Sequence, residues 1–119
     1  DLQDSLLFGT RFCNASMKGA DLRYSLIHES DFTGADLSGA KFTATEAHAG
    51  VPGYNKWIVT GYQRVSFRGA NLSGADFLRS SIRDADFTGA VMDGAVFQRG
   101  QLPQYNLSPE QLQVINIFG

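Results

Sequence analysis

The chain has 119 residues, enough for one modest domain, and it is 43% hydrophobic and 18% charged. Its net charge of −2 and its sequence pI near 5.5 argue against a protein that holds nucleic acid by charge. The hydrophobic content excludes a disordered chain, and no apolar run reaches the roughly 18 residues that cross a bilayer, so we expect no membrane insertion.

A large apolar residue recurs at every fifth position through most of the chain. Two residues earlier the side chain is nearly always small, and glycine often follows two residues later, as at Gly34 and Gly74. A period of five fits neither a helix nor a strand, but it fits a chain that turns a corner in every repeat. The large residues are Leu7, Phe12, Met17, Leu22, Ile27, Phe32, Leu37 and Phe42, then Phe67, Leu72, Phe77, Ile82, Phe87, Met92 and Phe97.

Several segments carry a resemblance to a known family. Ala20-Asp21-Leu22 and the stretches 35–39 (ADLSG) and 70–77 (ANLSGADF) resemble the pentapeptide repeat family, whose pattern is A(D/N)LXX, over roughly residues 5–42 and 65–100. The resemblance implies an all-β fold, a right-handed quadrilateral β-helix of about four coils, with four pentapeptides in each coil of twenty residues. It also implies a short member of the kind found in cyanobacteria and the chloroplast lumen.

A coil of twenty residues predicts which large residues stack. Positions twenty apart should share a face, and stacked phenylalanine rings should supply most of the buried apolar area. The predicted faces are Leu2, Leu22, Phe42, Ile82 and Leu102; Leu7, Ile27, Phe67 and Phe87; Phe12, Phe32, Leu72 and Met92; and Met17, Leu37, Phe77 and Phe97.

Residues 43–66 interrupt the repeat and leave two alternatives open. They form either a degenerate coil with Ala47, Pro52, Trp57 and Tyr62 pointing inward, or a loop that leaves after Phe42 and keeps the phase of the frame. Proline lacks the N–H that a ladder needs, and tryptophan exceeds a pocket sized for Leu or Phe, so we favour the loop. We therefore assign residues 1–107 to the β-helix with insertion 43–66, and 108–119 to a capping helix and tail.

The interruption also holds the candidate interaction residues Tyr54, Trp57 and Tyr62. Tyrosine and tryptophan are enriched at protein interfaces, so these three predict a site for a protein partner. The alternative is that they fold back and hold the loop against the β-helix.

The C-terminal segment predicts a short helix over the last coil. Ser108 suits the N-cap position, and Pro109 suits the first helical position. Gln111, three residues after Ser108, could complete a capping box. Leu112 and Ile115 would supply its apolar face, and an exposed last coil requires a cap. A dimer contact through Val114, Ile117 and Phe118 is the alternative, so we expect a monomer or a dimer through a coil end.

No set of residues in the sequence points to catalysis, a metal or a cofactor. His28 and His48 lack ligand spacing, and Cys13 falls at an outward position with no histidine beside it. The repeated acids, such as Asp36, precede the large residue, where the repeat places turn-forming side chains. We therefore predict that the protein is not an enzyme and has no cofactor.

These observations favour a scaffold or interaction module whose partner is another protein of unknown identity, with no nucleic acid. The family resemblance implies a second candidate, because some members imitate duplex DNA and bind DNA gyrase. Ten basic residues against twelve acidic ones leave too little negative charge for that role. The chain begins at Asp1 without methionine, and by family resemblance we expect a processed lumenal or periplasmic protein rather than a cytoplasmic one.

Overall fold

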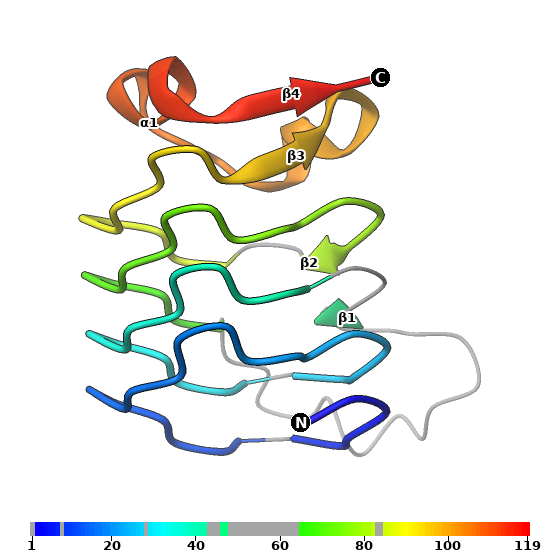
Figure 1. Cartoon of the computed structure of the whole chain (residues 1–119), viewed down its shortest axis with the longest axis vertical. Helices are drawn as coiled ribbons and strands as arrows, with labels where there is room; N and C mark the ends of the chain where they lie inside the picture. Colours follow the sequence, from blue (N-terminus) through cyan, green and yellow to red (C-terminus); the bar gives the residue numbers. More distant parts are fainter. Residues whose placement is uncertain (1, 8, 28, 43–45, 48–64, 83–84) are drawn as a thin grey trace.

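The chain winds into a stack of coils, with the N-terminus near the bottom and the C-terminus at the top of Figure 1. This computed structural model describes residues 2–7, 9–27, 29–42, 46–47, 65–82 and 85–119. Its elements are β1 (Glu46–Ala47), β2 (Ser81–Ile82), β3 (Val96–Gln98), the 3-10 helix η2 (Arg99–Gln104), α1 (Pro109–Val114) and β4 (Asn116–Phe118). Strand β1 pairs with β2, and β3 pairs with β4, both in parallel.

Parallel bridges join each coil to the next. Below the interruption they link residues twenty apart, as in Arg11 to Asp31, and the same spacing returns above it, as in Ser66 to Asp86. Each bridge is a pair of backbone hydrogen bonds: Phe12 donates to the carbonyl of Asp31 at 2.7 Å, and Asp31 donates to that of Thr10 at 2.9 Å. Below and above the interruption, four pentapeptides therefore separate the paired residues of successive coils, as the family resemblance implies.

Most pentads turn through the same backbone hydrogen bond. The N–H of the small residue donates to the carbonyl three positions earlier, as from Ala35 to Phe32 at 3.0 Å. Gly34, which precedes Ala35, has a φ of 69°, a left-handed conformation that glycine adopts without strain. A Cβ at Gly34 would also collide with the side-chain oxygen of Asn14. Glycine therefore suits this corner, although Asn14, Tyr24 and Arg79 adopt the same left-handed conformation at equivalent corners.

The register across the interruption differs from the predicted one. Asp31 bridges Ser66, and Lys41 bridges Asp76, so the two coils that flank the interruption lie directly on each other. This pairing leaves no room for a complete extra coil between them, and the loop alternative itself falls on residues outside the described ones. The bridged residues are thirty-five apart, so the insertion adds fifteen residues to a regular coil instead of the twenty predicted.

The predicted faces that span the interruption are consequently wrong. Phe67 stacks on Phe32 rather than sharing a face with Ile27, and Phe42 stacks on Phe77 rather than on Ile82. The chain instead takes one more regular step to Ala47, which lies opposite Ile82 in the β1–β2 pair. Any insertion of a multiple of five keeps the pentad frame, so the frame alone does not reveal how many pentads were added.

Two columns of phenylalanine rings fill the interior. One contains Phe12, Phe32, Phe67 and Phe87, with successive ring centroids 5.1 Å apart, and the other contains Phe42, Phe77 and Phe97 at 4.7 and 4.9 Å. The columns meet edge to face, as between Phe67 and Phe77 at 6.3 Å. Offset and edge-to-face contacts are both favourable arrangements of aromatic rings. The core is therefore ordered along the stack and across it.

Replacing Phe77 should show how far stability depends on these columns. Phe77 is fully buried and contacts rings in both columns and Tyr105. We expect Phe77→Ala to lower the free energy of unfolding by about 3–5 kcal/mol in guanidinium titrations, and Phe77→Asp to prevent folding. The exposed Lys18→Ala should change it by less than about 0.5 kcal/mol. Equal effects at the two positions would contradict the packing described.

Candidate functional site

The C-terminal end of the stack is covered by η2, α1 and β4, as the upper part of Figure 1 shows. After β3 the chain crosses the last coil and returns, so that β4 pairs in register with β3. Backbone bonds from Gly94 to the carbonyl of Val114 (2.8 Å) and from Asn116 to that of Ala95 (2.7 Å) attach the returning segment. This end carries the structural features that the pentad frame does not explain.

Tyr105 fills the top of the core and was not identified from the sequence. Its side chain is fully buried, and its ring lies 4.9 Å from Phe97 and 6.0 Å from Phe77. The phenol shares a hydrogen bond with the hydroxyl of the buried Ser80, which also donates to the carbonyl of Phe77 at 2.7 Å. Burial raises the pKa of Tyr105 to about 12, against the opposing effect of its hydrogen bonds to Ser80 and Ile82.

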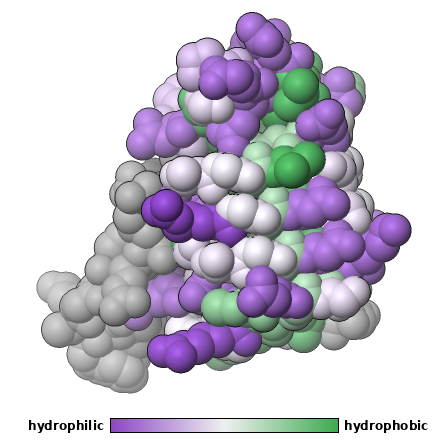
Figure 2. All heavy atoms as spheres, turned by 90° about the vertical axis from the view of Figure 1, so that its left-hand side faces the viewer, coloured by the Kyte–Doolittle hydropathy of each residue, from purple (hydrophilic) through white to green (hydrophobic). Residues whose placement is uncertain are grey.

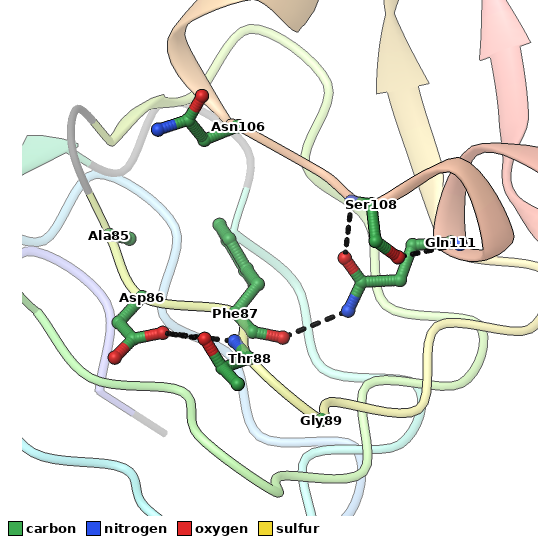
Figure 3. A pocket seen from close by; sticks show the side chains of 8 residues that line it. All are labelled: Ala85, Asp86, Phe87, Thr88, Gly89, Asn106, Ser108 and Gln111. Atoms are coloured by element: carbon green, nitrogen blue, oxygen red, sulfur yellow. Dashed lines mark hydrogen bonds between the residues drawn. The ribbon is translucent and has the colours of Figure 1, made fainter.

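The predicted capping box at the start of α1 is confirmed. Gln111 donates its N–H to the Ser108 hydroxyl at 3.1 Å, and Ser108 donates its N–H to the side-chain oxygen of Gln111 at 3.0 Å. The side-chain amide nitrogen of Gln111 also donates to the carbonyls of Phe87 (2.8 Å) and Ala90 (3.2 Å). Gln111 therefore fixes α1 to the last coil through groups that no sequence pattern marks (Figure 3).

The expected apolar face of α1 is only partly correct. Ile115 is buried directly after the helix, but Leu112 is 43% exposed and no residue of the helix itself is buried. Helix α1 is a short segment of six residues held by hydrogen bonds, so it does not need a wide apolar stripe. Of the predicted dimer residues, Val114 and Phe118 are exposed and Ile117 is partly buried.

Two grooves flank α1. The first, of about 350 Å³, is drawn in Figure 3 and is lined by residues 85–89, Asn106, Ser108 and Gln111. The second, of about 240 Å³, is lined by residues 90–93, Glu110, Gln111 and Val114. Both grooves lie between the last coil and the helix, with Gln111 in the wall that separates them.

The polar groups of the first groove already have partners. Asp86 accepts from the N–H of Thr88 at 3.0 Å and its hydroxyl at 2.6 Å, and from Arg68 at 3.1 Å. Partial burial would raise the pKa of Asp86, but these hydrogen bonds outweigh it and hold that pKa below its usual value. This carboxylate therefore acts as a turn-forming group.

The same turn chemistry accounts for the other acids of the coils. Asp36 accepts from the N–H and hydroxyl of Ser38, at 3.1 and 2.8 Å, which confirms the predicted turn-forming role. Asp21 accepts from the N–H of Arg23 at 3.2 Å and also pairs with its guanidinium at 2.7 Å, and the side-chain hydrogen bonds from Arg23 are the main reason that the pKa of Asp21 is lowered to about 2. The exposed Cys13 has a raised pKa, first because of its hydrogen bond with Asp31, so its thiol is less acidic than a free cysteine.

Neither a metal site nor a membrane-spanning helix is found in the described residues. No group of three or more His, Cys, Asp or Glu side chains there could hold a metal ion, and no helix there is long and apolar enough to cross a bilayer. His28, His48, Tyr54, Trp57 and Tyr62 lie outside the described residues, so their predicted positions are not tested.

The stacked coils define a β-helix solenoid. A family model of pentapeptide repeats matches residues 5–45 and 63–99 in eight copies, which is well over half of the chain. The chain therefore belongs to the pentapeptide repeat family. Proteins of this family are generally structural or interaction modules rather than enzymes.

Solved structures of similar proteins span cyanobacteria and plants. A pentapeptide repeat protein from Nostoc is 23% identical, with 91% of this chain and 84% of that chain covered and a TM-score of 0.39. One from the Arabidopsis thaliana thylakoid lumen is 20% identical, with 92% and 73% covered and a TM-score of 0.32. The plasmid-mediated fluoroquinolone resistance protein QnrB1 is 21% identical, with 94% and 46% covered and a TM-score of 0.36. The search of curated proteins gave no match.

Alkaline unfolding should report the burial of Tyr105. An unfolded tyrosine ionises near pH 10, whereas Tyr105 keeps its proton until its raised pKa of about 12. The stabilising contribution of the neutral phenol is therefore complete below pH 10 and is lost as the pH rises through 12. Between pH 9 and 12, we expect the free energy of unfolding to fall by about 2 kcal/mol more in the wild type than in Tyr105→Phe. Equal falls in both proteins would contradict the burial.

An NMR titration of the Asp21 carboxyl should test its ion pair with Arg23. We expect a midpoint of about 2 in the wild type and a clear rise in Arg23→Ala, because the guanidinium hydrogen bonds are lost. The stability linked to this carboxylate is present above pH 4 and is lost as the pH falls through the lowered pKa. Lys18→Ala should leave the Asp21 midpoint unchanged, and an unshifted midpoint in Arg23→Ala would show that the pair does not set it.

Proposed function

We propose that this protein is a non-enzymatic scaffold that binds another protein. The supporting observation is that four of the six exposed large apolar side chains among the described residues, Val91, Leu112, Val114 and Phe118, lie near the C-terminal end, while Leu6 and Tyr24 lie on the lower coils. On the faces, acids such as Asp36 and Asp86 are engaged in their own turns. Around the end, large apolar side chains stay in solvent, among them Phe118 at 54% and Val91 at 48% exposure. Exposed apolar groups that gather in one region are typical of interaction surfaces.

The finer architecture belongs to this proposal. We infer a right-handed quadrilateral β-helix of about four coils, with residues 108–119 as its cap and the insertion 43–66 as a loop that presents Tyr54, Trp57 and Tyr62 to the partner. A monomer, or a dimer through a coil end, is compatible with this role. We place the protein in a lumenal or periplasmic compartment, in keeping with the family members known from thylakoids.

The distribution of charge disfavours imitation of DNA. A DNA mimic needs a continuous negative surface, but basic groups interrupt the acids here. Arg23 pairs with Asp21 at 2.7 Å, and Arg68 pairs with Asp86 at 3.1 Å, so two of the acidic positions are neutralised locally. We therefore expect no inhibition of gyrase supercoiling at stoichiometric protein, and an inhibition would replace the scaffold proposal.

Affinity capture should identify the partner and locate its site. We expect the double variant Tyr54→Ala, Trp57→Ala to retain at least tenfold less of the partner protein than the wild type does. Truncating aromatic anchors removes much of the binding energy. The far-UV spectrum should stay unchanged, and Lys18→Ala should retain the partner. Identical capture by the wild type and the double variant would show that the loop is not the binding site.

A further inference from the structure

We propose that the groove of about 240 Å³ beside α1 binds a peptide segment of a partner protein, with one aliphatic side chain flanked by lysine or arginine. This inference rests on the proposed scaffold function and names the chemistry of its partner. On the face turned to the viewer in Figure 2, apolar surface adjoins hydrophilic side chains near the upper end of the molecule.

The two walls of the groove are held rigidly. Gln111 bonds to the carbonyls of Phe87 and Ala90, and the carbonyl of Val114 accepts from the N–H of Gly94 at 2.8 Å. Helix α1 is therefore attached to the last coil on both sides of the groove. A preformed site loses little conformational entropy when a ligand binds.

Val91 is an apolar residue at an outward position of its pentad, as Leu6 is in the first coil. It continues the outward column of Ser16, Asp36 and Asn71, which the bridges join in that order. Asp36 and Asn71 each accept a hydrogen bond from the backbone N–H two residues later, at 3.1 Å in both cases. Valine forgoes that bond and leaves an apolar side chain 48% exposed. A substitution that weakens a turn and exposes an apolar group indicates a binding role.

The lining combines an apolar centre with acidic residues. Val114, 40% exposed, and Val91 come from opposite walls, and the buried Met92 also lines the groove. Asp93 and Glu110 are exposed lining residues, one from each wall, and neither forms an ion pair with any described residue. Two exposed carboxylates that form no ion pair with a described residue, beside an apolar patch, complement a segment that carries positive charge on both sides of an aliphatic anchor.

The size of the groove agrees with a side chain as its occupant. Its volume of about 240 Å³ is below the roughly 300–1,000 Å³ that is typical of small-molecule sites. One branched aliphatic group with exposed charge pairs gives modest affinity, because such pairs contribute little in water. We therefore expect an isolated peptide to bind in the millimolar range and a whole partner to bind more tightly through additional contacts.

The test uses the full chain and the synthetic peptide acetyl-Gly-Lys-Leu-Lys-Gly-amide, followed by methyl NMR. We expect saturable shifts of the Val91, Met92 and Val114 methyl groups. The peptides acetyl-Gly-Glu-Leu-Glu-Gly-amide and acetyl-Gly-Lys-Ser-Lys-Gly-amide should bind at least fivefold more weakly, because they lack the charge and the anchor respectively. No shift at 5 mM peptide, or equal binding of the three peptides, would overturn the proposal.

Two variants separate binding from folding. Val91→Asn introduces the residue type found at Asn71, so this variant should fold at least as well as the wild type. Its affinity for the peptide should nevertheless fall at least tenfold. The double variant Asp93→Asn, Glu110→Gln should bind the peptide at least threefold more weakly than the wild type, and this difference should become smaller at high salt. Asp36→Asn, in the same column but two coils lower, is the matched control and should bind like the wild type. Unchanged binding in Val91→Asn would overturn the proposal.

Two further results distinguish this site from the scaffold function itself. Methyl shifts of Val91 that depend on protein concentration without peptide would show that a second copy occupies the groove, which overturns a basic peptide as its occupant. A partner that is captured equally by wild type and Val91→Asn but lost in the Tyr54→Ala, Trp57→Ala variant would overturn the groove and leave the scaffold function standing.

Discussion

The stacking of like residues between coils is the constraint on which the whole structure depends. Each coil has no core of its own, because its inward side chains are buried mainly by the coils above and below. Backbone bridges set the spacing of the coils, and the phenylalanine rings at centroid distances of 4.7–5.1 Å fit that spacing. A shift of one pentad would place rings against aliphatic side chains on every face. Ring stacking and backbone pairing therefore select the same register.

This constraint explains how the chain tolerates its interruption. Fifteen additional residues separate the flanking coils in sequence, yet these coils still pair directly and Phe32 stacks on Phe67. Lengthening a loop costs little free energy, because closure entropy grows only with the logarithm of its length. The coil pairing on either side is kept over four successive bridges from Asp31 to Glu46. A regular scaffold of this kind can therefore accept an insertion without losing its register.

The sequence predicts the features that repeat and misses those that occur once. The pentad frame, the acids at the turns and the capping box of Ser108 were all predictable, because each has a fixed local spacing. The register across the interruption was not, since every multiple of five preserves the frame. Tyr105 and Gln111 reach their partners through contacts across the last coil, which no spacing encodes. Val91 stands out only once its column of polar neighbours is known.

The pair formed by Ser80 and Tyr105 also has a consequence for how such a stack changes length in evolution. A coil duplicated below Ser80 would leave the two hydroxyl groups together beneath the cap. A duplicate of residues 81–100 would instead put Gly100 at the position where Ser80 now contacts the phenol. The hydroxyl of Tyr105 would then lie in an apolar interior without its partner. Such an orphaned group costs about 1–3 kcal/mol. The stack is therefore free to grow from its lower coils, whereas its upper end is chemically fixed.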